Sequence, residues 1–483
     1  MARPSSSARS SCASVPTPRL EMAMKLVRVL VANRGEIAVR IVRVCQAIGI
    51  ETVVATSEAD RDSLAARIAD RAFCVGPANA PESYLDPEKM VGAAIVTGCD
   101  CLHPGYGFLA ESPELAKLCA ENDIVFVGPS PDHILQMGNK VLSRKIAEDC
   151  GVPTLPGSEP VLDTDDAVSV AKEIGLPVMI KAASGGGGRG MKIIDDIDVL
   201  AAQIEVAASE AGAAFGDSTV YLEKYIGNAR HIEVQVLGDS HGNIVHLGER
   251  DCSLQRRHQK MVEEAPAPGL SADLRDRMRD AAVTLARAVN YESAGTVEFI
   301  FDMDSEAFYF LEMNTRIQVE HPVTEMITGE DLIEEQFRVA AGEKLRFSQA
   351  EISFRGHAIE CRINAERPEE GFLPSPGEIT EWRPPVAPYI RLESHCFQKY
   401  RVPVNYDSMI AKLVVYGRDR PQAIQRMQHA LSQFAIGGIE TTLDFQRRLI
   451  CSSNFIDGRM NTRLVDEIVG QSEKRAPGRA VSD

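Results

Sequence analysis

A chain of 483 residues, of which 44% are hydrophobic and 25% charged, has the size of about three soluble globular domains. The net charge of −17 repels nucleic acid and anionic membrane surfaces, so an anionic substrate would need a locally basic pocket. No run of about 18 apolar residues is present, which excludes a membrane-spanning helix. The eleven cysteines form no CxxC pair, which predicts buried free thiols in a reducing cytoplasm.

Residues 1–24 are rich in Ser, Arg and Pro and contain no acidic residue before Glu21. They lack the apolar core of a secretory signal. We interpret them as a disordered extension, or as sequence upstream of a true start at Met22 or Met24, which predicts a cytoplasmic protein. A transit peptide for import into an organelle is the alternative.

From residue 25, strand-like and helix-like segments alternate along the chain. Residues 26–32 form an apolar run, and the apolar residues after it recur at helical spacing up to Gly49, a residue typical of helix C-termini. The alternation continues to about Pro129, which predicts a parallel, doubly wound sheet. Its first turn, NRGEIA, lacks the GxGxxG pattern of dinucleotide-binding folds, so we do not expect a dehydrogenase domain.

Prolines and glycines in residues 151–160 mark a linker. The segment after it is typical of a strand, a glycine loop, a second strand, a helix and then several strands. After about Leu345 the sequence becomes rich in strand-like segments, and it closes with a helix that begins near Pro421. We therefore expect a mixed α/β and α+β fold in three parts with a short tail.

A run of four glycines, 185–188, lies in the segment KAASGGGGRGMK. Glycine suits positions where bare backbone must approach a ligand closely. A Walker loop would continue with GK[ST] and a helix, but this run has strand-like sequence on both sides. We therefore expect a hairpin flap of the kind that covers nucleotide phosphates in protein kinases, with Lys181 within reach of a phosphate. A flexible surface turn is the alternative.

Two apolar strands flank the polar stretch DMDSEA, which predicts a hairpin within residues 295–325. If the turn is centred near Ser305, Glu298 and Glu312 lie directly opposite each other. Like charges in that position destabilise a sheet, whereas a divalent cation such as Mg²⁺ stabilises them. We predict that the second strand stays extended, so that one face carries Glu312, Asn314, Arg316, Gln318 and Glu320. A solvated edge strand is the alternative.

The acidic chain contains one dense group of basic residues, at positions 250–260. Taken alone, a run of charges is usually a solvated face. Because this one accompanies a predicted phosphate flap and a carboxylate pair, we interpret it as a loop that holds anions through Arg250, Arg256, Arg257, His258 and Lys260.

Together these elements resemble the biotin carboxylase family of the ATP-grasp superfamily. The resemblance extends from about Leu26 to Leu464, and its most specific motifs are LEMNTRIQVEHPVTE at 311–325 and RDCSLQRRHQK at 250–260. The segments VANRGEIAVRI, HPGYGFLAES, GFLPSPG and YDSMIAK also carry it. The family has a Rossmann-like N-terminal domain, an ATP-grasp domain and a β-rich C-terminal domain, and the resemblance implies that these cover residues 25–137, 138–346 and 347–467, with a tail at 468–483. Here the mobile, glycine-rich lid of the ATP-grasp domain would span about 155–226.

The resemblance implies an enzyme that uses ATP to activate bicarbonate as carboxyphosphate and then carboxylates biotin on a carrier protein. It implies ATP-binding residues at Lys140, Lys181, Gly185, Gly186, Gly187, Gly188, Glu223, Lys224, Ile226, His231, Gln255 and His258. It implies Mg²⁺ or Mn²⁺ held by Glu298, Glu312 and Asn314. It implies bicarbonate held by Lys260, Arg316, Gln318, Val319 and Glu320.

The resemblance also assigns catalytic roles. Glu320 would be the general base, and Arg362 would stabilise the biotin enolate with its fixed charge. Lys260 and Arg316 would be further catalytic residues. The biotin ring itself would lie near Tyr106, Gly107 and Arg362.

The expected partners are a separate biotin carrier protein and carboxyltransferase subunits, with neither nucleic acid nor a membrane. A homodimer is expected, with Arg40 in the interface region. We expect acetyl-CoA carboxylase, in fatty acid synthesis, as the pathway, and another acyl-CoA or pyruvate carboxylase is the alternative. An ATP-grasp ligase that joins a carboxylate to an amine and a non-catalytic scaffold are the rival functions. The scaffold would have lost the metal ligands or the base, and all of these are present.

Overall fold

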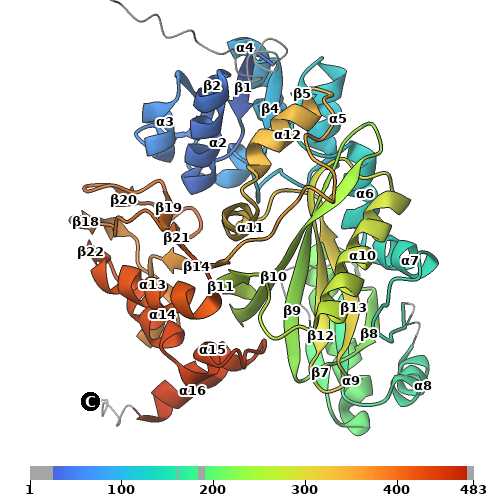
Figure 1. Cartoon of the computed structure of the whole chain (residues 1–483). Coiled ribbons are helices and arrows are strands. Elements are labelled where there is room, and N and C mark those ends of the chain that lie inside the picture. Colours follow the sequence, from blue (N-terminus) through green and yellow to red (C-terminus); the bar gives the residue numbers. More distant parts are fainter. Residues whose placement is uncertain (1–25, 159, 162, 183–190, 476–483) are drawn as a thin grey trace, which may run out of the picture.

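The computed structural model describes residues 26–158, 160–161, 163–182 and 191–475 (Figure 1). The glycine run 185–188 lies outside the described residues, and so does its predicted role over phosphates. The fold is mixed α/β and α+β, as the sequence predicts. Within the described ranges, no helix combines the length and the apolar character that a membrane span requires.

The N-terminal part is a five-stranded parallel sheet with the order β3-β2-β1-β4-β5, which confirms the predicted doubly wound sheet (Figure 1). Val29 and Val31 of β1 pack against α2, while Leu30 packs with α4 and α5 on the other face. Both faces are therefore buried, as parallel sheets require. The elements are β1 Arg28–Val31, α2 Gly35–Ile48, β2 Glu51–Ser57, α3 Leu64–Ile68, β3 Arg71–Gly76, α4 Pro87–Thr97, β4 Cys101–His103, α5 Pro113–Glu121, β5 Val125–Phe126, α6 Pro131–Gly138 and α7 Lys140–Asp149.

Helix α2 follows β1 after a tight turn, and its first turn contains Glu36. The helix ends as predicted at Gly49, whose φ of 81° is left-handed and whose N–H bonds back to the carbonyl of Cys45. This geometry places Glu36 at the end of α2 that follows the carboxyl end of β1. The carboxyl ends of parallel strands are where α/β sheets usually bind ligands.

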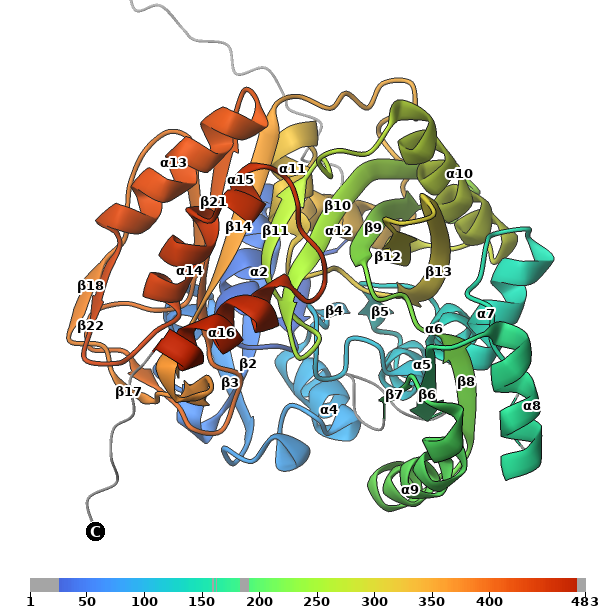
Figure 2. The same cartoon turned by 90° about the horizontal axis from the view of Figure 1, so that it is seen from below.

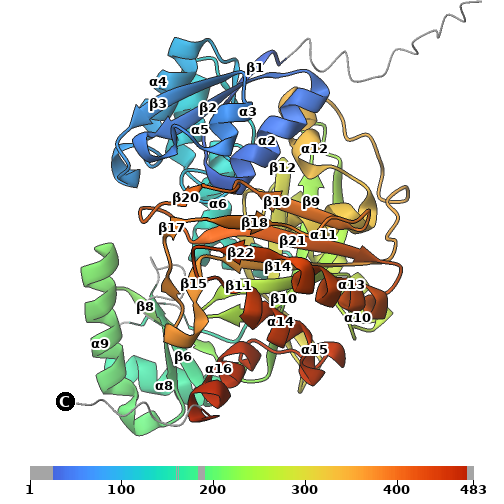
Figure 3. The same ribbon diagram turned by 90° about the vertical axis from the view of Figure 1, so that its left-hand side faces the viewer.

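A smaller unit follows α7 and forms a lobe at the lower left of Figure 3, away from the N-terminal sheet. It is a three-stranded antiparallel sheet, β7-β6-β8, covered by two helices. Val178 pairs with Ile194 and Ile180 with Lys192, so two antiparallel strands flank the glycine run, as predicted. The elements are α8 Thr164–Ile174, β6 Val178–Ala182, β7 Lys192–Ile194, α9 Ile197–Phe215 and β8 Val220–Lys224.

An eight-stranded antiparallel sheet forms the centre of the molecule, with the order β13-β12-β9-β10-β11-β14-β21-β19 (Figure 2). It joins strands from residues 229–314 to strands from residues 357–417. Its elements and the helices beside them are β9 Ala229–Gly238, β10 Ile244–Arg256, β11 Gln259–Ala265, α10 Ala272–Ala288, β12 Ser293–Asp302, β13 Ala307–Asn314, α11 His321–Thr328, α12 Leu332–Ala340, β14 His357–Asn364, β19 Ile390–Ser394 and β21 Met409–Gly417.

The C-terminal part completes the far side of this sheet. Helix α13 begins with Pro421 in its first turn, as predicted, and packs on β14 and β21. The prediction that it closes the chain is wrong, because three further helices follow it within the described residues. The remaining elements are β15 Glu366–Arg367, β16 Leu373–Pro374, β17 Gly377–Glu378, β18 Glu381–Arg383, β20 Arg401–Val402, α13 Arg420–Gln433, β22 Ala435–Gly437, α14 Leu443–Ile450, α15 Ser453–Ile456 and α16 Leu464–Arg475.

The described cysteines are all free thiols, as predicted. Most of them are buried, and Cys252 lies next to the cavity described below. Cys74 and Cys451 are exposed, so the prediction of burial is wrong for these two. Cys74 lies in β3, and Cys451 directly follows α14.

Candidate active site

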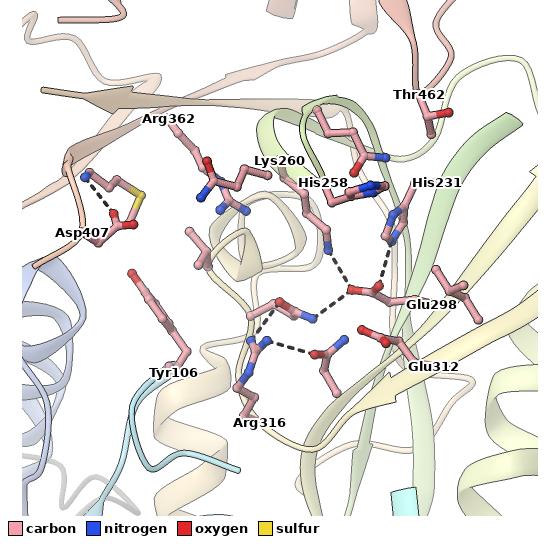
Figure 4. A pocket seen from close by; sticks show the side chains of 18 of the residues that line it. Tyr106, His231, His258, Lys260, Glu298, Glu312, Arg316, Arg362, Asp407 and Thr462 are labelled. Carbon is pink, nitrogen blue, oxygen red and sulfur yellow. Dashed lines mark hydrogen bonds and ion pairs between the residues drawn. The ribbon is translucent and has the colours of Figure 1, made fainter. Parts of the chain in front are cut away.

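A cavity of about 870 Å³ lies where the three parts of the chain meet (Figure 4). Its lining includes Glu36 from α2, Lys181 from β6, Glu298 from β12 and Arg362 from β14. This size is sufficient for a nucleotide and a second small substrate. The predicted site residues that line it are Tyr106, Gly107, Lys140, Lys181, Glu223, Lys224, Ile226, His231, Gln255, His258, Lys260, Glu298, Glu312, Asn314, Arg316, Gln318, Val319 and Arg362.

Glu298 and Glu312 face each other across β12 and β13, as predicted. The register shifts just after Glu298, where Phe299 pairs with Phe310, so Leu311 is an extra residue in the second strand. Burial and the neighbouring Glu298 carboxylate raise the pKa of Glu312 above its ordinary value. Crowded carboxylates of this kind are what a hard divalent cation stabilises.

The third predicted metal ligand, Asn314, lies beside this pair. Its Oδ1 accepts a hydrogen bond of 2.9 Å from Arg316, and its buried Nδ2 has no partner within the described part of the chain. The Nζ atom of Lys140 lies 3.7 Å from Glu312. The donor set of two carboxylates and one amide oxygen therefore fits Mg²⁺ completed by phosphate oxygens and water.

Three carboxylates surround the ammonium of Lys260. Its Nζ lies 2.6 Å from Glu233, 2.9 Å from Glu298 and 2.7 Å from Glu320. Burial alone would lower the pKa of Lys260, but these three negative charges raise it well above its ordinary value. Lys260 is therefore a fixed cation in the cavity wall, and Glu298 links it to the carboxylate pair (Figure 4).

The segment between Asn314 and α11 corrects one prediction. Strand β13 ends at Asn314, and the chain turns instead of staying extended to Glu320. Glu320 is the residue immediately before α11, and its side chain is fully buried rather than on the cavity lining. The turn still gathers the predicted polar groups, because Arg316 donates 3.0 Å to the Gln318 side chain and 2.9 Å to Glu111.

Glu320 receives two cations. Lys260 lies 2.7 Å from its Oε1, and the Arg362 guanidinium donates 2.9 Å to its Oε2. Burial would raise the pKa of Glu320, but Lys260, Arg362 and Arg250 together hold it well below its usual range. The ionised Glu320 thus forms a bridge between two cations that line the cavity.

The basic segment 250–260 is a β-hairpin and not the predicted loop. It comprises the end of β10, the start of β11 and a turn at Arg257 and His258, both with positive φ. Arg250 is fully buried, and it donates to Glu233, Gln235, Thr296 and Thr324. Its predicted anion-binding role is therefore wrong, because its donors are already bonded within the protein.

The other basic residues of the hairpin divide between two surroundings. His258 and Lys260 line the cavity, together with the neutral Gln255. Arg256 instead donates 3.0 Å to the carbonyl of Gly371 and lies over the Phe372 ring. Only one side of the hairpin tip is therefore available to an anion in the cavity.

The opposite end of the cavity contains the predicted nucleotide residues. Lys181 forms an ion pair with Glu223, which also lies 3.4 Å from Arg144. The Lys224 ammonium donates hydrogen bonds to the carbonyls of Gly175 and Leu176. Lys224 can therefore contact a ligand through its backbone groups.

Two histidines lie between the nucleotide end and the cation end. Burial would lower the pKa of His231, but Glu298 at 3.1 Å raises it overall. Burial and the nearby Lys181 lower the pKa of His258, which favours the neutral imidazole. A neutral His258 can donate a hydrogen bond to a phosphate without adding charge.

Several residues at or beside the cavity were not predicted. Glu233 does not line the cavity but contacts Lys260. It belongs to the alternating sequence His231, Glu233, Gln235 on β9, and such alternation in a fully buried strand was the available signal. Asn364 follows Arg362 at the same face of β14. The other unpredicted polar residues of the lining include Asn33, Arg34, Glu36, Tyr225, Gln259, Asn405, Tyr406, Asp407 and Thr462.

Three known protein families match most of the chain. Residues 25–134 match "Biotin carboxylase, N-terminal domain", residues 139–348 match "Carbamoyl-phosphate synthase L chain, ATP binding domain", and residues 360–467 match "Biotin carboxylase C-terminal domain". Biotin carboxylase 1 of Bacillus subtilis is 52% identical over 91% of this chain and 98% of its own length. A pyruvate carboxylase subunit of Methanothermobacter thermautotrophicus is 49% identical over 91% of this chain and 89% of its own.

Solved structures agree with these relatives. The biotin carboxylase of Campylobacter jejuni, described as a β-γ-ATP complex, superposes with a TM-score of 0.89 at 47% identity and covers 92% of this chain and 99% of its own. The biotin carboxylase domain dimer of Hydrogenobacter thermophilus 2-oxoglutarate carboxylase, solved with MgADP, ADP and bicarbonate, gives 0.88 at 46% identity, covering 92% and 97%. The chain belongs to the biotin carboxylase family of ATP-dependent ligases.

Proposed function

We propose that the protein carboxylates biotin on a biotin carboxyl carrier protein, using ATP and bicarbonate through carboxyphosphate. The observation that carries this proposal is the single cavity that joins the carboxylate pair at Glu298 and Glu312 to the cations Lys260, Arg316 and Arg362. A site for metal and phosphates at one end and for anions at the other is what phosphoryl transfer to bicarbonate requires.

The proposed roles follow the positions of the groups. Lys181 and His258 contact ATP phosphates, while Lys260 and Arg316 bind bicarbonate together with Gln318 and the Val319 backbone. A second anion beside Lys260 and Arg362 would share their charge with Glu320. The pKa of Glu320 would then rise from its depressed value, and Glu320 could accept a proton as a general base.

Glu298, Glu312 and the Asn314 amide oxygen are the proposed ligands of Mg²⁺. When bound, the ion neutralises charge on the phosphate oxygens. Tyr106 and Arg362 lie at the other end of the lining, where Arg362 would stabilise negative charge on the biotin ring. Mn²⁺ is proposed as a substitute for Mg²⁺ in the same site.

For the pathway, we propose the first half-reaction of acetyl-CoA carboxylase. The relatives include enzymes named for pyruvate and 2-oxoglutarate at similar identity, so a carrier shared with another transferase is the second candidate. A homodimer is also proposed, as in the relative described as a dimer. Arg40, in the proposed interface region, is already paired within its own chain with Glu325 and Asp331.

The activity is tested by mixing the protein with ATP, Mg²⁺, bicarbonate and free biotin. We expect ADP release that depends on both bicarbonate and biotin. Absence of biotin-dependent ADP release would contradict the proposal. The pathway is tested by copurification, in which the biotinylated protein and transferase that accompany the chain identify the final acceptor.

A further inference from the structure

Lys412 is a fully buried lysine that no predicted role explains, although it ends the motif YDSMIAK. Its Nζ donates 2.7 Å to the carbonyl oxygen of Val319 and lies 3.0 Å from Oε1 of Glu36. A lysine is almost never fully buried unless it is paired. Glu36, which is itself buried, provides this partner.

The three partners come from distant parts of the chain. Glu36 lies in the first turn of α2, Val319 in the turn before α11, and Lys412 in β21. One ammonium therefore ties the N-terminal sheet, the central turn and the C-terminal strands together beside the cavity. Glu36 and Val319 both line that cavity.

Both partners of Lys412 are connected to a proposed active-site residue: Val319 to Glu320, and Glu36 to Tyr106. The Val319 carbonyl belongs to the peptide that joins Val319 to Glu320, so Lys412 fixes the backbone from which Glu320 projects. Oε1 of Glu36 also accepts a hydrogen bond from the Tyr106 hydroxyl, and the Lys412 Nζ lies 5.9 Å from the centre of the Tyr106 ring. Burial and Glu36 raise the pKa of Tyr106, which keeps this hydroxyl protonated as a donor.

Lys412 also lies beside Arg362. The two residues are directly paired in the antiparallel register of β14 and β21, so their side chains leave the same face of the sheet. Arg362 reaches Glu320 at 2.9 Å, while Lys412 holds the peptide bond before it. The backbone and the carboxylate of Glu320 are thus held by neighbouring residues of two paired strands.

We propose that Lys412 and Glu36 are positioning residues of the active site, which fix Glu320 and Tyr106 relative to each other and so align the base with the biotin ring. This inference rests on the proposed function. A purely structural ion pair would affect stability alone. A positioning pair affects turnover with biotin even in a folded protein that still binds MgATP.

The decisive variant is K412M/E36Q, which removes both charges together and leaves no buried charge unpaired. We expect its Kd for MgATP to stay within about threefold of wild type, because the proposed ATP residues lie elsewhere in the cavity. Biotin-dependent ADP formation is expected to fall at least about 100-fold, as misplacement of reacting groups by about 1 Å can cause. A folded double variant with turnover within about threefold of wild type would overturn the inference.

The single variant E36Q decides the question if the double variant does not fold. Glutamine keeps the shape of Glu36 and can accept from both donors, but its hydrogen bonds lack the charge that makes such bonds about twice as strong. We expect kcat/KM for free biotin to fall about tenfold, mainly through KM, with the Kd for MgATP unchanged. An unaltered KM for biotin in E36Q would count against the positioning role.

The matched control is E249Q. Glu249 is as buried as Glu36 and accepts from Arg275 at 2.6 Å and Arg279 at 2.8 Å, but it does not line the cavity. We expect the turnover of E249Q to stay within about twofold of wild type. This control separates a general effect of neutralising a buried carboxylate from the specific effect of losing Glu36. The wild-type protein distinguishes failure of the proposed function from failure of the inference. If the wild type shows no biotin-dependent ADP release, the proposed function is wrong and the inference falls with it. Loss in the variants alone supports the inference.

Discussion

At the scale of single residues, the ion pairs around Glu320 determine what this carboxylate can do. Two cations at 2.7 and 2.9 Å keep Glu320 ionised, and only an ionised carboxylate can accept a proton. The same cations make it a weak base until another anion shares them. The arrangement therefore links the basicity of Glu320 to the presence of an anion beside Lys260 and Arg362.

Replacing Glu320 by Gln tests this link. The amide oxygen can still accept a hydrogen bond from one of the two cations, but the NH2 group that replaces the other oxygen cannot accept, and the side chain cannot take a proton. We expect turnover with free biotin to fall at least about 100-fold, within the range for loss of a general base, with MgATP binding unchanged. ADP release and isothermal titration with MgATP measure the two effects. Full turnover in E320Q would remove Glu320 from its role.

Glu360 is a second buried carboxyl with a different state. It pairs with Glu263 across β14 and β11, and neither of its oxygens has a hydrogen-bond partner among the described residues. Burial raises the pKa of Glu360 well above its ordinary value, and the neighbouring Glu263 carboxylate raises it further. The positive charges of Lys412 and Arg362 offset only part of this rise. The folded protein therefore holds Glu360 protonated at a pH where the unfolded chain has already lost the proton.

This difference predicts a pH-dependent stability. Because the folded state binds more protons, stability falls as pH rises above the unfolded pKa of about 4.5 and toward the raised folded pKa. Gln is a neutral substitute that does not titrate, so E360Q should lose this fall, and its Tm advantage over wild type should grow from pH 5.5 to pH 8.5. The exposed Glu88→Gln is the control. An equal Tm difference at both pH values would contradict a protonated Glu360.

At the scale of elements, helix α11 places Glu320 at its start and is anchored at its other end. Glu325 lies 2.7 Å from Arg391 of β19 and 3.1 Å from Arg40 of α2, and all three side chains are largely buried. These pairs join α11 to both neighbouring parts of the molecule. Removing one member of a buried ion pair leaves the others uncompensated.

Glu325→Gln is therefore expected to lower the free energy of unfolding by about 3 kcal/mol, seen as a lower urea midpoint. The comparison is Asp273→Asn, which removes an exposed partner of Arg277 in α10 and should change stability by less than about 1 kcal/mol. If both variants shifted the midpoint equally, the anchoring role of Glu325 would be wrong.

The elements also show what the sequence can predict. The pairing of Glu298 with Glu312 follows from two apolar strands and one polar turn, because register depends on local pattern. The turn after Asn314 does not follow, because alternating polar residues fit a strand and this turn equally well. Contacts with Glu111 and Lys412, distant in sequence, accompany the turn that forms. The wrong prediction of Arg250 as an anion ligand has the same cause. The partners that bury Arg250 lie on β9, β12 and α11, and a local sequence pattern does not reveal them.

At the scale of the whole molecule, one cavity draws on every part of the chain. Glu36 belongs to helix α2 on the parallel sheet, Lys181 to the small lobe, Glu298 to the central strands and Arg362 to the strands that continue the same sheet. A ligand that fills this cavity contacts all of these parts at once. Its binding free energy therefore stabilises the assembled molecule against unfolding.

Removal of the metal is the test at this scale. At about 100 times its Kd, MgATP should add about 2.7 kcal/mol of stability and raise Tm, whereas ATP with EDTA should add less. Glu312→Gln should abolish the difference between these two conditions, because a neutral amide is a poor ligand for Mg²⁺. Glu306→Gln, at the tip of the same hairpin and exposed, should keep it. If E312Q showed the same metal-dependent rise in Tm as wild type, the carboxylate pair would not be the metal site, and the facing charges of Glu298 and Glu312 would need another explanation.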